Sequence, residues 1–196
     1  MATAATAIEL PPIQIEAISF MLIGDSPLIV HAWSEKAKRQ MLDKQMKKAT
    51  KAKEAKDPQA DYEACFYRTA SGGYGFPAIG VKAAMISACR FADLKMTLAR
   101  GAFHIDAEML DVIGEPRPRE DMVRVGMGTA DIRYRPEFVE WRIPVTIKIN
   151  ASVISPEQVA NLLNIAGFGV GIGEWRPEKN GQYGRFHVAS SAEVGS

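Results

Sequence analysis

The sequence predicts a protein of the α+β class, with strands and helices packed in one domain. Residues 13–23 are rich in β-branched and aromatic side chains, which is typical of a strand. Residues 138–150 alternate between apolar and polar side chains, which predicts the longest strand of the chain. Between these strands, Val81, Met85 and Ala88 recur at helical spacing. The length of 196 residues and a hydrophobic content of 47% suit one domain with a substantial core.

The ends of the chain predict mobile segments around a single domain at residues 13–189. Residues 1–12 contain no basic residue and no long apolar run, so we expect a mobile leader and not a signal peptide. Residues 190–196 form a small polar tail that we also expect to be mobile. Since no apolar run reaches the ~18 residues of a membrane span, no membrane partner is expected. The two cysteines form no CxxC motif, which favours a cytoplasmic protein without disulfides.

Residues 34–58 predict a basic helical insertion after the first strand. Ser34 is a suitable N-cap, and the helix should run to about residue 56, before Asp57 and Pro58 end it. Residues 36–56 carry nine Lys or Arg residues and two acids, and the apolar stripe of Leu42, Met46 and Ala49 is thin. Two interpretations remain open: a solvated or partly disordered surface helix, and an electrostatic arm for nucleic acid. The cations that would form the arm are Lys36, Lys38, Arg39, Lys47 and Lys48.

The middle of the chain predicts a core helix followed by a β-rich insertion at residues 103–135. Pro77 suits the first turn of the helix, and Lys82 lies one turn from its start. Within the insertion we expect a weak strand at 103–110, a proline-rich loop at 114–119 and short strands at 122–125 and 131–134. His104, Asp106 and Glu108 would share one face of the first strand. Three such ligands could hold a metal. Polar residues in this pattern more often form a solvent-exposed strand face, so we expect no metal.

The last part of the chain predicts a helix, a glycine-rich segment and a final strand. Ser155 is a suitable N-cap for a helix at 156–166, and residues 183–188 read as the last strand. The core order is then strand, helix, strand, strand, helix, strand, which is the ferredoxin-like pattern. A four-stranded sheet with two helices on one face would leave its other face open for bases.

The segment at residues 167–188 is the most distinctive stretch of the sequence. It contains six glycines, which could bring bare backbone N–H groups close to a ligand. A dinucleotide-binding loop is disfavoured because this segment follows a helix, and a P-loop is disfavoured because no Gly-Lys-Ser/Thr is present. A second interpretation also remains open: the segment could be an ordinary glycine-rich hairpin with an aromatic plug. The glycines are Gly167, Gly169, Gly171, Gly173, Gly181 and Gly184, and the cationic and aromatic residues among them are Trp175, Arg176, Lys179, Tyr183 and Arg185.

Three segments together resemble a known family. They are the glycine-rich segment from Gly169 to Phe186, the Phe76-Pro77 pair with Lys82 and Arg90, and Pro27-Leu28 after the first strand. The pattern resembles the RAMP superfamily of CRISPR proteins, whose members carry a glycine-rich loop between the last helix and last strand of a modified ferredoxin-like core. The resemblance implies a relative of the repeated backbone subunits, which polymerise along a guide RNA. The chain is short for that group, so a phage or mobile-element relative remains an alternative.

These patterns predict a non-catalytic protein that binds single-stranded RNA or DNA without a cofactor. Copies are expected to assemble side by side along the strand. The first alternative is a metal-independent endoribonuclease with His31 as general acid or base; the second is a phage structural or inhibitor protein that acts through protein contacts. Trp175 would stack on a base or anchor the loop. The residues expected to contact the strand are Lys36, Lys38, Arg39, Lys47, Lys48, Lys82, Gly171, Gly173, Trp175, Arg176, Lys179, Tyr183 and Arg185.

Overall fold

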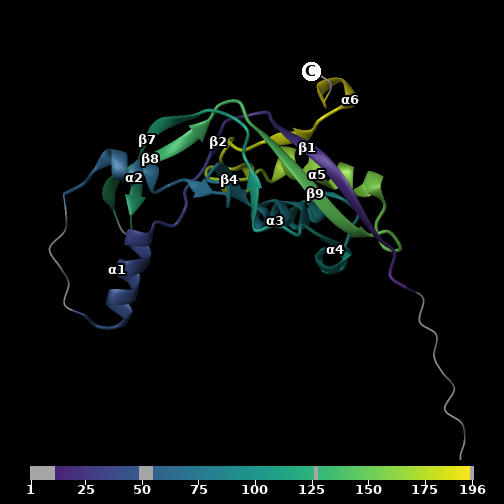
Figure 1. Cartoon of the computed structure of the whole chain (residues 1–196), viewed down its shortest axis with the longest axis horizontal. Helices are drawn as coiled ribbons and strands as arrows, with labels where there is room; N and C mark the ends of the chain where they lie inside the picture. Colours follow the sequence, from purple (N-terminus) through teal and green to yellow (C-terminus); the bar gives the residue numbers. More distant parts are fainter. Residues whose placement is uncertain (1–11, 49–54, 126–127, 195–196) are drawn as a thin grey trace, which may run out of the picture.

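The computed structural model describes residues 12–48, 55–125 and 128–194 (Figure 1). Within this part of the chain, the strands form three antiparallel sheets and the helices pack mainly against one of them. The α+β class is therefore confirmed. The predicted leader lies outside the described residues, apart from residue 12.

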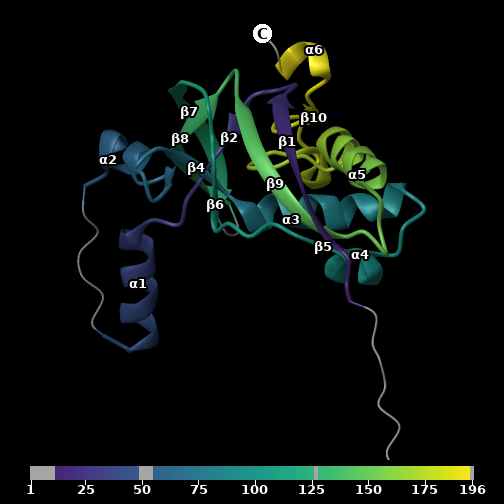
Figure 2. The ribbon, with the colours of Figure 1, turned by 45° about the vertical axis from the view of Figure 1, so that its right-hand side comes forward.

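The four-stranded sheet has the strand order β10-β1-β9-β5, and every neighbouring pair is antiparallel. Its inner face packs on helices α3 (Ala78–Ala88) and α5 (Pro156–Gly169), which lie on one side of the sheet in Figures 1 and 2. Burial alternates strictly along β9 from Ile143 to Ile149, as the sequence predicts. The strands are β1 (Ile15–Gly24), β5 (Phe103–His104), β9 (Arg142–Asn150) and β10 (Phe186–Val188).

Two three-stranded sheets extend from this core. One has the order β2-β8-β7 and carries a long hairpin; the other has the order β3-β4-β6. The first consists of β2 (Leu28–Ile29), β7 (Pro116–Val125) and β8 (Thr129–Phe138). The second consists of β3 (Tyr67–Arg68), β4 (Tyr74–Pro77) and β6 (Met109–Asp111).

Helix α1 (Glu35–Gln45) stands apart from the sheets at one end of the molecule (Figures 1 and 2). The predicted N-cap is confirmed, because the Ser34 side chain accepts a hydrogen bond from the Ala37 N–H. None of its residues is buried. The remaining helical segments are α2 (Pro58–Glu63), η1 (Cys89–Phe91), α4 (Met96–Ala102), η2 (Pro177–Lys179) and α6 (Ser191–Val194).

The prediction of one long basic helix is wrong at its C-terminal end. Helix α1 ends at Gln45, and Lys47 adopts a left-handed φ of 54°, which a continuing helix does not allow. Asp57 and Pro58 begin α2 instead of ending α1, since the Asp57 side chain caps the Ala60 N–H and Pro58 occupies the first turn. Ala49, the last member of the predicted apolar stripe, lies outside the described residues.

The proline-rich segment predicted as a loop is part of strand β7. Pro116 and Pro118 pair with Phe138 and Pro136 of β8. Proline is tolerated there because β7 is the edge strand of its sheet, so a missing N–H need not break a ladder. The predicted long strand at 138–150 is likewise divided: β8 ends at Phe138, and β9 begins at Arg142.

The predicted tail contains helix α6. The Glu193 carboxylate accepts hydrogen bonds from the Ser190 N–H and hydroxyl, and it lies 3.1 Å from His187 Nε2. Asp25 contacts the other ring nitrogen of His187 at 2.6 Å. Burial alone would lower the pKa of His187, but these two carboxylates raise it above its usual value.

Candidate nucleic-acid interface

A pocket of about 320 Å³ lies between α3 and the glycine-rich segment, and we call it the base pocket. Small side chains of α3, including Gly80, Ala83 and Ala84, form one wall. Residues 170–174 form the opposite wall, and His31 and Tyr67 close one side. The pocket therefore brings Gly171, Gly173 and Arg176 of the predicted site next to the core helix.

The glycines of this segment serve close backbone packing. Gly171, Gly173 and Gly184 have φ values of 69°, 77° and 64°, in the left-handed region that favours glycine. The Gly184 N–H donates to Pro27 O at 2.8 Å, and the Glu174 N–H donates to Ile29 O at 2.9 Å, which fastens the segment to the chain around β2. The expectation that Gly171 offers a bare donor is wrong, because its N–H donates to Ala166 O at 2.8 Å.

Arg176 is held within the segment by its own hydrogen bonds. Its guanidinium donates to Glu178 at 3.0 and 3.2 Å and to the Gly173 carbonyl at 3.2 Å. Arg90 also donates to Glu178, at 3.0 Å. Burial would raise the pKa of Glu178, but hydrogen bonds from Ser87 and Arg176 and the nearby positive charges lower it. The rim of the base pocket is thus a fixed ionic cluster, and a phosphate contact by Arg176 stays a prediction.

The other residues of the segment that were predicted to contact the strand lie at least partly at the surface and differ in their neighbours. Trp175 is 43% exposed and has a φ of 55°. The Tyr183 ring lies beneath the Arg119 guanidinium, 4.8 Å from ring centroid to Cζ, so one face of the ring is already covered. Arg185 donates to Gln182 O at 3.3 Å, and Lys179 is exposed.

A second pocket, of about 370 Å³, adjoins the base pocket at His31; we call it the cationic pocket. It lies between the start of α1, the end of α2 and strand β8, and Lys36, Lys56 and Arg133 line it. Asp131 also lines it and lies 2.8 Å from both Lys56 Nζ and Arg133 Nε. Lys36 is the only residue of the predicted arm among the residues described as lining this pocket.

Alternating arginines on the β7–β8 hairpin add positive charge behind the cationic pocket. Arg135 is only 6% exposed and lies 3.6 Å from Asp121. Its neighbour across the ladder, Arg119, donates to Glu137 at 2.8 Å. Sequence reasoning missed this cluster. The signal was present as arginines two residues apart, which a strand places on one face: Arg117 and Arg119 in β7, and Arg133 and Arg135 in β8.

His31 is half-buried and lines both pockets. Burial is the largest cause that lowers its pKa, and the charges of Arg135 and Arg133 lower it further, whereas Glu174 opposes the shift. Its imidazole is therefore neutral at neutral pH. Its backbone carbonyl accepts a hydrogen bond from the Tyr67 hydroxyl at 3.3 Å.

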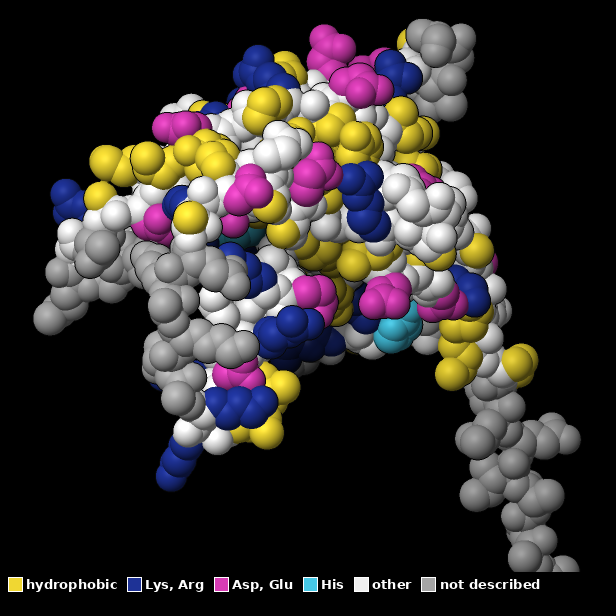
Figure 3. Space-filling view, turned by 60° about the vertical axis from the view of Figure 1, so that its left-hand side comes forward, with side chains coloured by type: hydrophobic (Ala, Val, Ile, Leu, Met, Phe, Trp, Pro, Cys, Tyr) yellow, Lys and Arg dark blue, Asp and Glu magenta, His cyan; other side chains and the backbone are white. Residues whose placement is uncertain are grey.

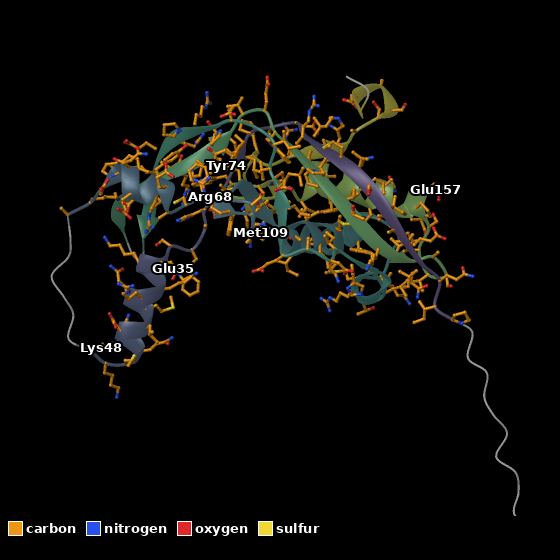
Figure 4. The ribbon with its side chains drawn as sticks, in the orientation of Figure 1. Glu35, Lys48, Arg68, Tyr74, Met109 and Glu157 are labelled. Carbon is orange, nitrogen blue, oxygen red and sulfur yellow. The ribbon has the colours of Figure 1, made fainter. Side chains whose placement is uncertain are left out.

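The remaining predicted cations lie away from the two pockets. Figure 4 places Glu35 and Lys48 at the two ends of α1, and Figure 3 shows Lys and Arg side chains gathered around this helix. Lys38 pairs with Glu35, and Lys48 pairs with Asp43 at 3.0 Å. Lys82 projects from α3, 3.1 Å from the His104 ring, and lines neither pocket.

The outer face of the four-stranded sheet does not suit base stacking. Ser19 and Thr146 are hydrogen-bonded there at 2.9 Å, and Lys148 pairs with Asp106 at 2.6 Å. The register places no Phe, Tyr or Trp on this outer face along the four described strands. Single-strand binding sheets use such rings as stacking platforms. The expectation that this face receives the bases is therefore unsupported by its side chains.

The three residues considered as metal ligands do not share a strand face. Strand β5 ends at His104, whose ring lies beside Lys82, and Asp106 pairs with Lys148. The Lys148 hydrogen bond and charge lower the pKa of Asp106. Across the described ranges of the chain, no group of three His, Cys, Asp or Glu residues has a geometry that could hold a metal ion. In those ranges, no helix is long and apolar enough to cross a membrane.

Comparison with known proteins gives similarity to solved structures and not to known sequences. No family model matches the chain, and no curated protein matches its sequence. Among solved structures, the chain is similar to the crystal structure of Cmr6 from Pyrococcus furiosus, with a TM-score of 0.49 and 10% sequence identity. The similarity covers 91% of this chain and 100% of that chain.

Proposed function

We propose that this protein binds single-stranded nucleic acid across the two pockets that meet at His31. The observation that carries the proposal is that an apolar pocket and a cationic pocket meet at this residue. One pocket has apolar walls with aromatic residues, and the other is lined by cations. A single strand offers the matching pair of groups, unstacked bases and phosphates, at neighbouring positions.

The phosphates would follow the cationic pocket and helix α1. The formal net charge of the protein is +1, so affinity must come from local cations. Lys36 connects the pocket to the other cations of α1, and none of the helix residues is buried. Because phosphate contacts carry no base information, this part of the surface would bind RNA or DNA of any sequence.

We also propose that the four-stranded sheet with α3 and α5 is a ferredoxin-like core of the RAMP kind. The order β10-β1-β9-β5 places the last strand, first strand, third strand and second strand of the core side by side. The glycine-rich segment lies between the last core helix and the last strand. The insertion predicted at 34–58 contains α1 and only the first residue of α2. The insertion predicted at 103–135 contains β6, β7 and most of β8, and it begins with β5, which belongs to the core sheet.

The strand-binding state would be an assembly of copies placed side by side. Helix α1 leaves Met41, Leu42 and Met46 48%, 54% and 58% exposed, with no element of the described chain covering them. A neighbouring copy on the same strand would cover this apolar face, and contacts that repeat without closing give filaments. Binding would then be cooperative along the strand.

A second candidate function is RNA cleavage with His31 as general base. The observation that favours it is a neutral imidazole in the junction of the pockets, beside a cationic wall that could stabilise a charged transition state. Glu174 is a candidate partner, because its charge acts on His31. Binding without cleavage is the simpler proposal because it needs no second catalytic group.

Light scattering with single strands of about 10, 20 and 40 nucleotides tests binding and assembly together. We expect the mass of the complexes to rise with strand length, and the strands to remain intact on a denaturing gel. A constant mass of one protein per strand would contradict assembly. Cleavage of the strands by the parent protein, but not by the His31→Ala variant, would favour the nuclease. The absence of a complex at every strand length would favour a protein-binding role.

A further inference from the structure

We propose that the base pocket selects guanine, through the carboxylate of Glu174. This inference rests on the proposed function and gives it a base preference. The cationic pocket and α1 would bind the strand without regard to sequence, and the base pocket would add one specific contact. The occupant is a single unstacked guanine of the bound strand.

The size and walls of the base pocket suit one planar base. Its volume of about 320 Å³ is at the lower end of the range for small-molecule sites, about 300 to 1,000 Å³. The side chains of Val30, Phe76, Val170 and Ile172 give it an apolar interior, and Ile79, which is 70% exposed, lies at its mouth. The backbone around it is fixed, because the Ile172 N–H donates to Gly184 O at 2.9 Å.

Glu174 is one of the two carboxylates that line this pocket, and its negative charge acts on His31. Its backbone N–H is tied to Ile29 O at 2.9 Å, so its position on the wall is set. The Glu174 side chain is half-buried, and within the described residues its carboxylate has neither a hydrogen bond nor an ion pair. The other carboxylate of the lining, Glu178, is already bound by Arg176 and Arg90. A half-buried carboxylate without donors favours a ligand that supplies them.

Guanine supplies two donors side by side, because its N1–H and its exocyclic N2 amine share the Watson–Crick edge. One carboxylate can accept both hydrogen bonds in a bidentate pair. Adenine and cytosine place an acceptor next to their amine, and uracil flanks its single N–H with two carbonyls. These bases would bring an acceptor towards the carboxylate of Glu174, which costs affinity. His31 borders both pockets, so the phosphate of a bound guanine nucleotide would lie near the cationic side.

Calorimetric titration of the full chain with the four ribonucleoside monophosphates tests the base pocket without a strand. We expect guanosine monophosphate to bind about tenfold more tightly than the other three. Glu174→Gln, which keeps the shape and replaces one acceptor by a donor, should remove this preference. Ala83→Leu adds a side chain to the pocket from an exposed position of α3 and should weaken all four nucleotides. Ala107→Leu, at an exposed position between β5 and β6 that lines neither pocket, is the matched control and should bind as the parent does.

The outcomes separate this inference from the proposed function. Equal binding of the four nucleotides, binding of none, or an unchanged preference in Glu174→Gln would each overturn the guanine pocket. If the parent protein still binds single strands in that case, the proposed function stands. If guanosine monophosphate binds selectively but no strand binds, the guanine pocket stands and the proposed function fails.

Discussion

Replacing Gly184 by alanine is expected to lower the free energy of unfolding by about 3 kcal/mol or more. An added Cβ at this position would lie 1.8 Å from the Ile172 carbonyl oxygen, which is part of the wall of the base pocket. Gly184 also has a φ of 64°, where a side chain costs about 1–2 kcal/mol by itself. Relief of the clash would break the hydrogen bond from Ile172 N–H to Gly184 O.

Gly72→Ala is the control that separates the two costs. Gly72 has a φ of 86°, but an added Cβ there meets no atom within 4 Å. This variant should lose only the conformational cost, about 1–2 kcal/mol. Urea unfolding of both variants measures the difference. Equal destabilisation of the two would show that the segment around Gly184 yields readily and does not hold the pocket wall.

Reversing charge on α1 is the change expected to weaken strand binding most while leaving the fold intact. The variant is Lys36→Glu, Lys38→Glu and Arg39→Glu, and it removes three cations from a helix without buried residues. Each lost phosphate contact should lower the slope of log affinity against log salt by about 0.7. At low salt, we expect affinity to fall at least tenfold.

The matched control places the same kind of change at the other end of the molecule. Lys95 and Arg100 are exposed at helix α4, which lies far from α1 in Figures 1 and 2. Their reversal should leave the salt slope nearly as it is in the parent. If fluorescence anisotropy shows equal losses for both variants, net charge governs binding, and α1 has no special part in it.

The sequence could predict the local features of this fold, because they depend on neighbouring residues. Ser155 forms the expected N-cap, completed by Gln158 in a capping box. The alternation in β9 follows from its two unlike faces. The first part of β7 was predicted as a loop because prolines usually interrupt strands, and only the sheet order shows that β7 lies at an edge.

The candidate site was harder to predict because it is made by contacts between distant segments. His31, Gly80 and Glu174 come together only when the glycine-rich segment packs beside α3 and β2. A sequence pattern does not distinguish a glycine that offers its N–H to a ligand from one that packs against a carbonyl. Gly171 proved to be of the second kind. Likewise, the burial of Arg135 depends on the strand pairing of β8.

Hydrogen exchange of the protein, alone and saturated with a single strand of about 15 nucleotides, tests the central claim most directly. If the strand crosses the two pockets, backbone amides should gain protection at residues 30–37, 133–135 and 171–176, which border His31. The two central strands of the four-stranded sheet, β1 and β9, should exchange at the same rate in both samples. Protection confined to β1 and β9, or no change in any peptide, would contradict the account.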